Sequence, residues 1–494
     1  MPWLPPHLVE RFEQSLNSSN FDQVAATLKL ALEANDREDR QQRITEWKRS
    51  LRKDFSASYQ HLRRKAASAP VQVSAVQGKA TANIADRLSS IEEVWKNIYS
   101  THKNGEPTFR RFMEIYGPSL RASRANCGIL TEDVLVKALK QMKASSPGLD
   151  QILTPELQVA ASWCPSLIHH LARLLQMIER CHKWPTHLTK GVVAFIPEEP
   201  DKETPLLDEF RPITVLSCIY RLWASARHLQ LTQSWFATWQ QRNSFGGKGS
   251  SSADQLALQT CIQLSETYAQ GGVVAGLGFD LRKCFDTIPF GLALDLFLTR
   301  GCDPDIVQTL RNFYSHHQKY FRLDGHHSPP FKPTCGIVQG CPLSMLILTS
   351  LVTSWLEYND AQIPAAVSRA YADDMSSVVS GQSTAFVKEG LRSVFQSTQQ
   401  FTSVAGMQIN TRKTFTFGTN TFKHTVPQIQ DHQTSFRLVG CSIKISHQPM
   451  WTPLEQQRML GWTKVVQRIQ NLPQSWQIKV RILQSVMSKL SFGA

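Results

Sequence analysis

Two adjacent acids, Asp373 and Asp374, are the strongest candidates for chemistry in this sequence of 494 residues. They lie between two short runs that favour extended backbone, 369–372 and 375–379, so we expect a β-hairpin with both carboxylates at its turn. Neighbouring carboxylates repel each other unless a positive charge lies beside them, and a divalent cation supplies one. For the pair alone, an ordinary acidic surface turn is the alternative interpretation.

A third carboxylate, that of Asp280, decides between these interpretations. Asp280 follows the apolar run 273–279, which reads as a buried strand with its only acid at the carboxyl end. Such an acid, facing an acidic hairpin on a neighbouring strand, would form the all-oxygen site that Mg²⁺ prefers. Two such cations stabilise the attacking and leaving oxygens of an in-line phosphoryl displacement, so the sequence predicts phosphoryl transfer.

Five segments, in order along the chain, resemble motifs A to E of reverse transcriptases. Motif A is matched by Phe-Asp-Leu-Arg-Lys-Cys-Phe-Asp (279–286), motif B by Gly-Ile-Val-Gln-Gly-Cys-Pro-Leu-Ser (336–344) and motif C by Tyr-Ala-Asp-Asp (371–374). Motif D is matched by 406–414, and the motif E primer grip by 436–440. Five motifs in this order are far more specific than any one of them. The pattern resembles the non-LTR retrotransposon type, with group II intron enzymes as relatives.

The resemblance implies a role for each palm residue that matches a motif. All three acids would be catalytic metal ligands: Asp280 and Asp373 would bridge two Mg²⁺ ions, with Mn²⁺ as an alternative, and Asp374 would mainly tune the metal and the primer. Phe285 would pack under the sugar and exclude a 2′-hydroxyl, which favours dNTPs over rNTPs. A plain core residue is the alternative for Phe285. Asp286 is expected to be solvated or to cap a helix.

Other matched residues would hold the nucleotide and the nucleic acid. Arg211, in a run that resembles the family's fingers strand, would clamp the β- and γ-phosphates, unless it pairs with the acids of the preceding loop. Gln339 and Gly340 would line the nucleotide pocket, Gly340 because a side chain would obstruct the base or sugar. Lys413 would protonate the leaving pyrophosphate, unless it is ordinary surface charge. The further candidates for contacts to template or primer are Lys248, Tyr371, Leu438 and Gly440.

Composition agrees with a nucleic-acid partner. The formal net charge of +14 favours a polyanion, although basicity alone does not prove one. Ten cysteines without zinc spacing are expected to be reduced and mostly buried, and three His-His doublets lack a further ligand nearby. The chain begins without a signal-peptide pattern and contains no apolar run that could span a bilayer. We therefore expect a soluble intracellular protein, in the nucleus or the cytoplasm, without a membrane partner.

The elements that must position these residues predict an α+β fold, a right-hand polymerase with an antiparallel palm sheet backed by helices. Upstream, Thr131 is expected to cap one helix, and a single helix is expected over 155–181. Basic residues between 37 and 65 would bind nucleic acid or form a solvated helix face. The expected parts are a helical, basic N-terminal extension (1–129) with a linker near 68–82, fingers and upper palm (130–272), palm (273–435), and primer grip with a truncated helical thumb (436–494), the reverse transcriptase domain spanning about 178–445.

The implied activity is RNA-directed DNA polymerisation, in which the 3′-hydroxyl of a DNA or RNA primer is extended with dNTPs on an RNA template. An RNA-dependent RNA polymerase is one alternative, which Phe285 argues against. A group II intron-type maturase is another, although such proteins usually carry a domain after the thumb. A retroelement remnant that only binds nucleic acid is a third; the intact acids argue against it and the abrupt C-terminus argues for it. The oligomeric state is not indicated.

Overall fold

A five-stranded sheet in the order β6-β7-β3-β8-β9 is the largest sheet among the described residues of the computed structural model. β3 (Val273–Phe279) pairs antiparallel with β7 (Asp374–Gly381) and with β8 (Phe415–Phe417), and β7 pairs antiparallel with β6 (Ala366–Tyr371). β9 (Asp431–Gln433) runs parallel to β8. The predicted α+β fold with an antiparallel palm sheet is therefore confirmed, with one parallel strand at its edge.

The structure describes residues 84–102, 105, 107–198, 206–247, 253–323, 325–445 and 450–451. Four predictions lie outside these residues: the basic segment 37–65, the linker near 68–82, Lys248 and the thumb beyond 451. Within the described residues, no helix is both long and apolar enough to cross a membrane.

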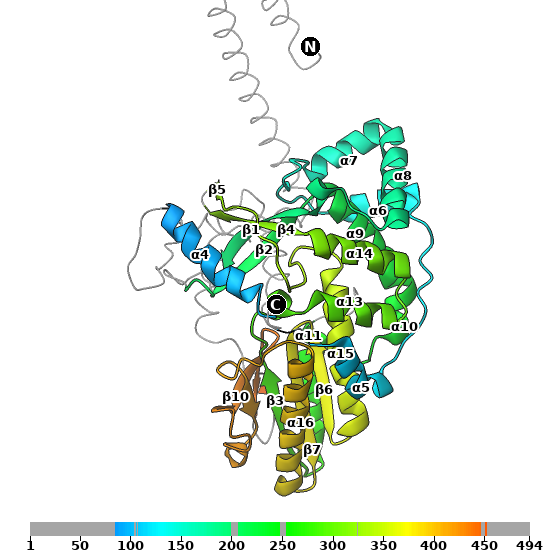
Figure 1. Ribbon diagram of the computed structural model, residues 1–494. Coiled ribbons are helices and arrows are strands. Elements are labelled where there is room, and N and C mark those ends of the chain that lie inside the picture. The colour runs from blue at the N-terminus through cyan, green and yellow to red at the C-terminus, as the bar shows by residue number, and fades with distance from the viewer. Residues whose placement is uncertain are drawn as a thin grey trace, which may run out of the picture. The chain divides into compact units, whose positions relative to one another are not determined.

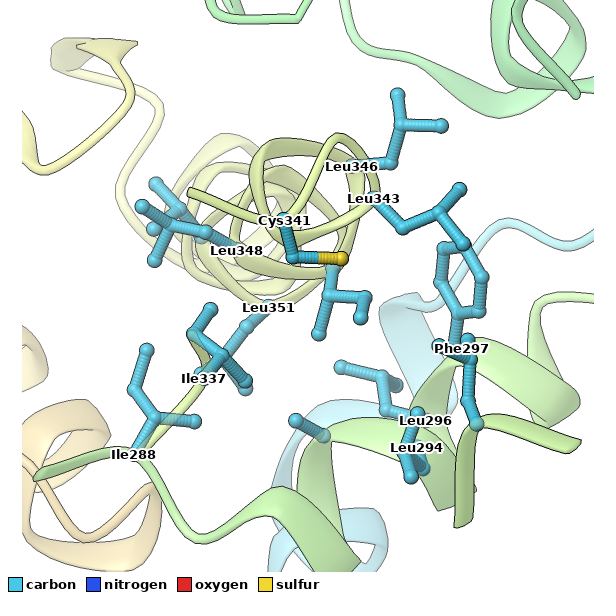
Figure 2. Packing of buried hydrophobic residues seen from close by; sticks show 14 of the residues in the cluster. Ile288, Leu294, Leu296, Phe297, Ile337, Cys341, Leu343, Leu346, Leu348 and Leu351 are labelled. Carbon is cyan, nitrogen blue, oxygen red and sulfur yellow. The ribbon is translucent and has the colours of Figure 1, made fainter. Parts of the chain in front are cut away.

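Helices α15 (Ser344–Gln362) and α16 (Thr384–Val404) pack against the palm sheet (Figure 1). Ala275 and Leu277 of β3 belong to the same buried cluster as these helices. Figure 2 shows part of this cluster, where leucines at the start of α15 face those of α13 (Phe290–Thr299). The helix predicted behind the palm, α15, is confirmed and packs mainly on β6, whereas α16 packs on β3 and β7.

Aromatic rings cover the other face of β3, and its glycines make room for them. A Cβ on Gly276 would lie 2.2 Å from the ring of Phe417, and a Cβ on Gly278 would lie 2.5 Å from the ring of Phe415. The ring of Phe417 in turn stacks on that of Phe436, with centroids 4.1 Å apart. The glycines of the predicted strand thus allow a layer of aromatic side chains to approach the backbone closely.

A second sheet, in the order β2-β1-β4-β5, lies beside the helices of the N-terminal half. β1 (Lys190–Pro197) pairs antiparallel with β2 (Phe210–Leu216) and parallel with β4 (Gln318–Leu323), and β5 is the short strand His326–His327. Helix α4 (Ile84–Ile98) packs on this sheet. The buried residues that join the helix region to the sheet are Ile91, Trp95, Tyr99, Val193, Phe210 and Phe321.

Helices form a shell next to this second sheet. The side chain of Thr131 accepts a hydrogen bond from the backbone N–H of Val134 and caps α6 (Glu132–Gln141), as predicted. The single helix predicted over 155–181 is wrong, because the chain forms α7 (Thr154–Trp163) and α8 (Pro165–Cys181) instead. The proline that begins α8 has no N–H to donate and restricts the residue before it, so the helix breaks there.

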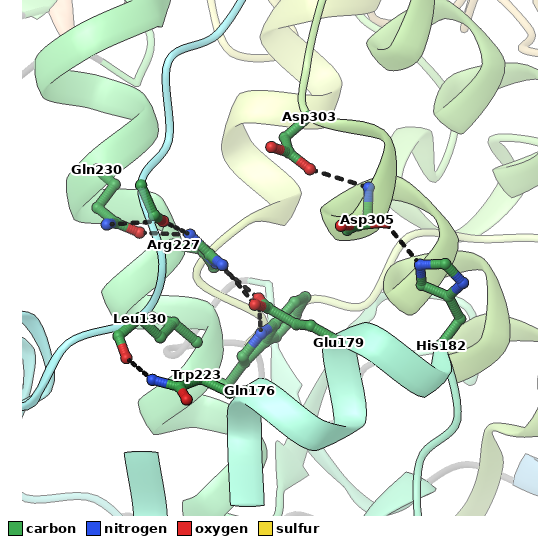
Figure 3. Close-up of polar contacts among 10 residues, drawn as sticks. Leu130, Gln176, Glu179, His182, Trp223, Arg227, Gln230, Asp303 and Asp305 are labelled. Atoms are coloured by element: carbon green, nitrogen blue, oxygen red, sulfur yellow. Dashed lines mark hydrogen bonds and ion pairs between the residues drawn. The ribbon is translucent and has the colours of Figure 1, made fainter. Parts of the chain in front are cut away.

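Buried ion pairs hold the helices of this shell together. Glu179 on α8 accepts hydrogen bonds from Trp223 Nε1 at 2.7 Å and from Arg227 Nε at 2.6 Å (Figure 3). A second pair joins Arg300 to Glu357 of α15, with Nη2 and Oε2 2.9 Å apart and both side chains at most 1% exposed. In both pairs, each charge faces a charge of opposite sign.

The remaining elements are α5 (Phe109–Tyr116), α9 (Cys218–Leu231), a π-helix (Thr232–Phe236), α10 (Ala237–Trp239), α11 (Ala253–Ala269), α12 (Cys284–Thr287), α14 (Pro304–His316), β10 (Ser435–Leu438), β11 (Cys441–Lys444), β12 (Met450–Trp451) and short 3₁₀ turns at Gly117–Ser119, Thr186–Thr189 and Asn420–Phe422.

The ten cysteines are all free, and seven of them are buried. This agrees with the expectation that they are reduced and mostly lie in the core.

Candidate active site

The three predicted acids lie at one end of the palm sheet. Asp373 and Asp374 are at the turn of the hairpin formed by β6 and β7. Phe279 of β3 pairs with Met375 of β7, so the next residue of β3, Asp280, lies across from Asp374. Opposed residues of antiparallel strands point to the same face of a sheet, so these two carboxylates share a face.

The chain before α11 fixes the turn that carries Asp373. The backbone N–H of Phe245 donates to the carbonyl of Ala370 at 2.8 Å, and the N–H of Ala370 donates to the carbonyl of Asn243 at 3.1 Å. A Cβ on Gly246 would lie 2.7 Å from the backbone nitrogen of Ala372. Ala372 itself has a φ of +57°, a left-handed conformation that costs energy for a residue other than glycine. Contacts from another segment therefore hold the turn in a strained shape.

Burial raises the pKa values of all three acids, and repulsion from neighbouring acids adds to this effect for Asp373 and Asp374. Burial raises the pKa of Asp373, and the charge of Asp280 raises it further. Burial, followed by the charges of Asp373 and Asp280, raises the pKa of Asp374 to about 6. The positive charge of Arg211 lowers both pKa values, although less than burial raises them. The site carries more negative charge than its neighbours compensate, and a bound cation would supply the difference.

Asn410 holds Asp280 in place. Its Nδ2 donates to Oδ2 of Asp280 at 2.8 Å, and its backbone N–H donates to the Asp280 carbonyl at 2.8 Å. The backbone N–H of Asp280 donates to Oγ1 of Thr414 at 3.2 Å. Burial raises the pKa of Asp280, whereas the Asn410 hydrogen bond lowers it. Sequence reasoning assigned no role to Asn410, and its position in the segment that resembles motif D was the available signal.

Two lysines share one glutamate at the rim of the site. Lys283 Nζ donates to Oε1 of Glu198 at 2.5 Å and to the carbonyl of Phe210 at 3.1 Å. Lys413 Nζ lies 3.6 Å from Oε2 of the same glutamate, and its side chain is 61% exposed. The charge of Lys413 lowers the pKa of Asp280. Lys413 is thus near the acids and open to solvent, and Glu198 is a further residue that sequence reasoning missed.

The residues predicted to hold the nucleotide lie on segments joined by backbone hydrogen bonds. Arg211 is exposed on β2. Phe285 on α12 is half-buried, and its carbonyl accepts a hydrogen bond from the N–H of Ile337 at 2.8 Å. The carbonyl of Gln339 accepts a hydrogen bond from the N–H of Thr214 on β2 at 2.8 Å. These bonds tie β2, α12 and the loop before α15 together.

Gly340 is required for a reason that the sequence did not indicate. Its φ is +121°, and a Cβ there would lie 2.3 Å from the carbonyl oxygen of Thr214. The close approach that demands glycine is therefore to the backbone of β2.

With this geometry established, comparison with known proteins identifies the family. The model of the family "Reverse transcriptase (RNA-dependent DNA polymerase)" matches residues 197–443, half of the chain. The chain belongs to the reverse transcriptase family. The matched span includes the strand of Arg211, the three acids and the loop of Gln339, so the fold is that of a right-hand polymerase.

Relatives of this reverse transcriptase come from non-LTR elements, as predicted. It is 27% identical over 296 residues to the retrovirus-related Pol polyprotein from type-2 retrotransposable element R2DM of Drosophila melanogaster, covering 58% of this chain and 26% of that protein. It is 23% identical over 256 residues to the transposon TX1 uncharacterized 149 kDa protein of Xenopus laevis, covering 50% of this chain and 19% of that protein. The chain spans about a quarter or less of the length of these relatives.

Two solved structures of telomerase from Candida tropicalis are also similar. The apo form, truncated from its C-terminal domain, is 13% identical with a TM-score of 0.39, covering 52% of this chain and 54% of that chain. The complex with the TWJ fragment of telomeric RNA is 11% identical with a TM-score of 0.41, covering 62% and 54%.

The expectation that Asp286 of this reverse transcriptase is solvated or caps a helix is wrong. Asp286 is 1% exposed, and its Oδ2 accepts a hydrogen bond from Gln339 Nε2 at 2.9 Å. The short helix α12 turns the side chain inward, where the positive charge of Lys319 on β4 acts on it. The partner thus comes from a strand that no local pattern connects to Asp286.

The segment that resembles the primer grip forms the hairpin of β10 and β11. Val439 and Gly440 make its turn, with φ values of +43° and +89°. Leu438 is 5% exposed and lies in the cluster with the aromatic rings beneath β3, and Tyr371 packs against the same cluster. A nucleic acid could therefore meet the turn of this hairpin, whereas the side chain of Leu438 serves the core.

The three acids fit Mg²⁺ by the chemistry of their donors. Their oxygens form the hard, negatively charged set that this cation prefers. Burial is the main cause of their raised pKa values, and repulsion between acids adds to it for Asp373 and Asp374. Within the described part of the chain, no three His, Cys, Asp or Glu side chains form a preformed metal-binding cluster. This holds for the three His-His doublets as well.

Proposed function

We propose that this chain is an RNA-directed DNA polymerase that extends the 3′-hydroxyl of a DNA or RNA primer with dNTPs on an RNA template. One observation supports this most strongly: in a member of the reverse transcriptase family, the register of β3 with β7 brings Asp280 to the hairpin turn of Asp373 and Asp374. The neighbouring family members named above are retrotransposon proteins, so a retroelement origin is part of the proposal.

The acids would hold two Mg²⁺ ions, or Mn²⁺ in their place. Bound cations would supply positive charge at the attacking and leaving oxygens of the phosphoryl transfer. Asp280 and Asp373 would be the main ligands of these ions, and Asp374 would assist. Asn410 would keep Asp280 oriented for this task through its 2.8 Å hydrogen bond.

Three further side chains would act on the nucleotide. Arg211 would bind the β- and γ-phosphates with its planar, permanently charged fork, and its influence on the pKa values of Asp373 and Asp374 supports a position beside them. Phe285 would pack under the sugar and exclude a 2′-hydroxyl. Lys413 would donate a proton to the leaving pyrophosphate, a general-acid role that suits an ammonium group near the acids and open to solvent.

The proposed organisation follows from these roles. The boundaries are a helical, basic N-terminal extension over 1–129, fingers and upper palm over 130–272, palm over 273–435, and primer grip with thumb over 436–494. The turn of the β10–β11 hairpin, with Gly440, would meet the primer strand.

Primer extension tests the proposal. The full chain is incubated with poly-rA and oligo-dT, dTTP and Mg²⁺, and the Asp373→Ala variant serves as the control. We expect incorporation by the wild type, background levels with the variant, and a strong preference for dTTP over UTP. Equal incorporation by both proteins would remove the catalytic role of Asp373, and equal use of dTTP and UTP would remove the role of Phe285.

A further inference from the structure

A buried cluster of polar side chains lies beneath the predicted nucleotide pocket. It joins Asp286 of α12, Gln339 of the loop before α15, Lys319 of β4 and Tyr99 after α4. Asp286, Lys319 and Tyr99 are at most 2% exposed. Burying two full charges is costly, so a chain that keeps them needs each to serve the other or a third group.

Lys319 is the positive partner in this cluster. Its Nζ lies 3.4 Å from the centroid of the Tyr99 ring, a cation–π arrangement. Its backbone N–H and carbonyl each form a 2.8 Å hydrogen bond with Phe331, which fixes β4 at this point. Burial lowers the pKa of Lys319 and raises that of Asp286, and the charge of each opposes the effect of burial on the other.

The contact between Asp286 and Gln339 links this pair to the pocket. Gln339 Nε2 donates to Oδ2 of Asp286 at 2.9 Å, and the backbone of Gln339 is held by Thr214 at 2.8 Å. Because its main chain is fixed, Gln339 can change only its side-chain conformation. The hydrogen bond to the charged carboxylate of Asp286 restricts this conformation strongly. A Cβ on Gly336 would lie 2.8 Å from the carbonyl of Asp286, so the loop also presses directly on α12.

We infer that Asp286 is a positioning residue for nucleotide binding: it fixes the side-chain amide of Gln339 at the pocket, with buried Lys319 as its counter-charge. This inference rests on the proposed function, because it takes Gln339 to contact the nucleotide. In this inference, Asp286 acts through Gln339 and not on the three acids. Its effect is thus on the affinity for dNTP rather than on the chemical step.

The test compares KM for dTTP with kcat on poly-rA/oligo-dT. The double variant Asp286→Leu/Lys319→Met removes both buried charges together, so that neither is left unpaired, and it also removes the acceptor of the Gln339 hydrogen bond. We expect KM to rise about tenfold, the usual scale for a lost hydrogen bond to a charged group, and kcat to change less than about threefold. The matched control is Glu179→Gln/Arg227→Met, which neutralises a buried pair in the helical shell and should leave KM unchanged.

A second measurement keeps the inference testable if the buried variants do not fold. Gln339→Met changes a half-buried side chain, and its KM should rise as much as that of the double variant, with no further rise when the two are combined. A wild-type KM in a folded double variant, or in Gln339→Met, would overturn the inference.

Failure of the proposed function is separated by a binding assay. Stabilisation by dTTP of the complex with a dideoxy-terminated primer is measured without turnover. A wild type that binds dTTP but does not extend primers refutes the activity, while weaker dTTP binding by Gln339→Met and the double variant still supports the positioning role. A wild type that neither extends nor binds refutes both.

Discussion

The helical shell and the end of the palm sheet use the same charged residue types in opposite ways. In the shell, Arg300 and Glu357 face each other with at most 1% exposure, and Arg227 faces Glu179. At the palm, burial raises the pKa values of three neighbouring acids, and repulsion adds to this effect for Asp373 and Asp374. The positive charges of Arg211 and of the rim lysines offset these shifts only in part. Charges that serve the fold are thus matched within it, whereas charges that serve a ligand are left for the ligand to match.

The largest expected effect is the loss of catalysis at the palm. Asp373→Ala should reduce primer extension at least about a thousandfold, because electrostatic stabilisation at the reacting phosphate would be lost. Its melting temperature should stay near that of the wild type, since one repelling charge is removed. Rates are measured by dTTP incorporation under single-turnover conditions, and residual extension above a tenth of wild type would contradict the comparison.

In the helical shell, we expect removal of one charge to lower stability strongly, in contrast to the palm. Glu357→Ala leaves Arg300 buried without its partner and should lower the free energy of unfolding by about 3–5 kcal/mol. The exposed pair of Arg392 and Glu389 offers the matched control, because Glu389→Ala should cost less than about 1 kcal/mol. Urea denaturation of the three proteins measures both values. An equal loss in the free energy of unfolding for the two variants would show that burial of the ion pair does not determine this loss.

At His317 we expect a third situation, in which the buried side chain stays uncharged. Burial, and then the charge of Lys319, lowers the pKa of this histidine from 6.5 to about 3. In the unfolded chain it takes up a proton below pH 6.5, so the folded state should lose up to about 1.4 kcal/mol of stability per pH unit between 6.5 and 3, and nothing above 6.5.

Urea denaturation at pH 7.5 and 5.5 measures this effect. The variant His317→Gln should lose less stability than the wild type between the two values. The difference between the proteins isolates the histidine from the acids, whose raised pKa values act in the opposite direction. An identical loss in both would refute the assignment.

The smallest effect is expected from relieving repulsion at the palm. Asp374→Asn removes one of three neighbouring charges and should leave the free energy of unfolding unchanged or raise it by less than about 1 kcal/mol. The residue is exposed at the end of the sheet, although nearby side chains partly desolvate its carboxylate, and exposed charges interact weakly. Thermal melting at neutral pH and low salt measures it. Addition of Mg²⁺ should raise the melting temperature of the wild type more than that of Asp374→Asn, and a larger rise in the variant would argue against a shared cation.

Sequence patterns predicted the parts of this site that local structure determines. The hairpin of Asp373 and Asp374 and the strand ending at Asp280 follow from alternation and turn residues, and they are observed. The burial of Asp286 could not be foreseen, because its surroundings are built by Lys319, a single lysine in a short strand 33 positions later. Gly340 was predicted to line the nucleotide pocket, but the atom that a Cβ there would meet is the carbonyl oxygen of Thr214 on β2. Contacts with residues of distant strands produce no periodic pattern in the local sequence, so sequence patterns cannot predict them.

The bridge between Ser244 and Ala370 has a consequence for how the protein behaves in concentrated solution. β6 is an outer strand of the palm sheet, and an uncovered outer strand offers free N–H and C=O groups to which another molecule can add its own strand. Here the chain at 243–245 occupies those groups beside the turn. Residues 243–245, which fix the acidic hairpin, therefore also hinder edge-to-edge pairing of β6 with a strand of another molecule.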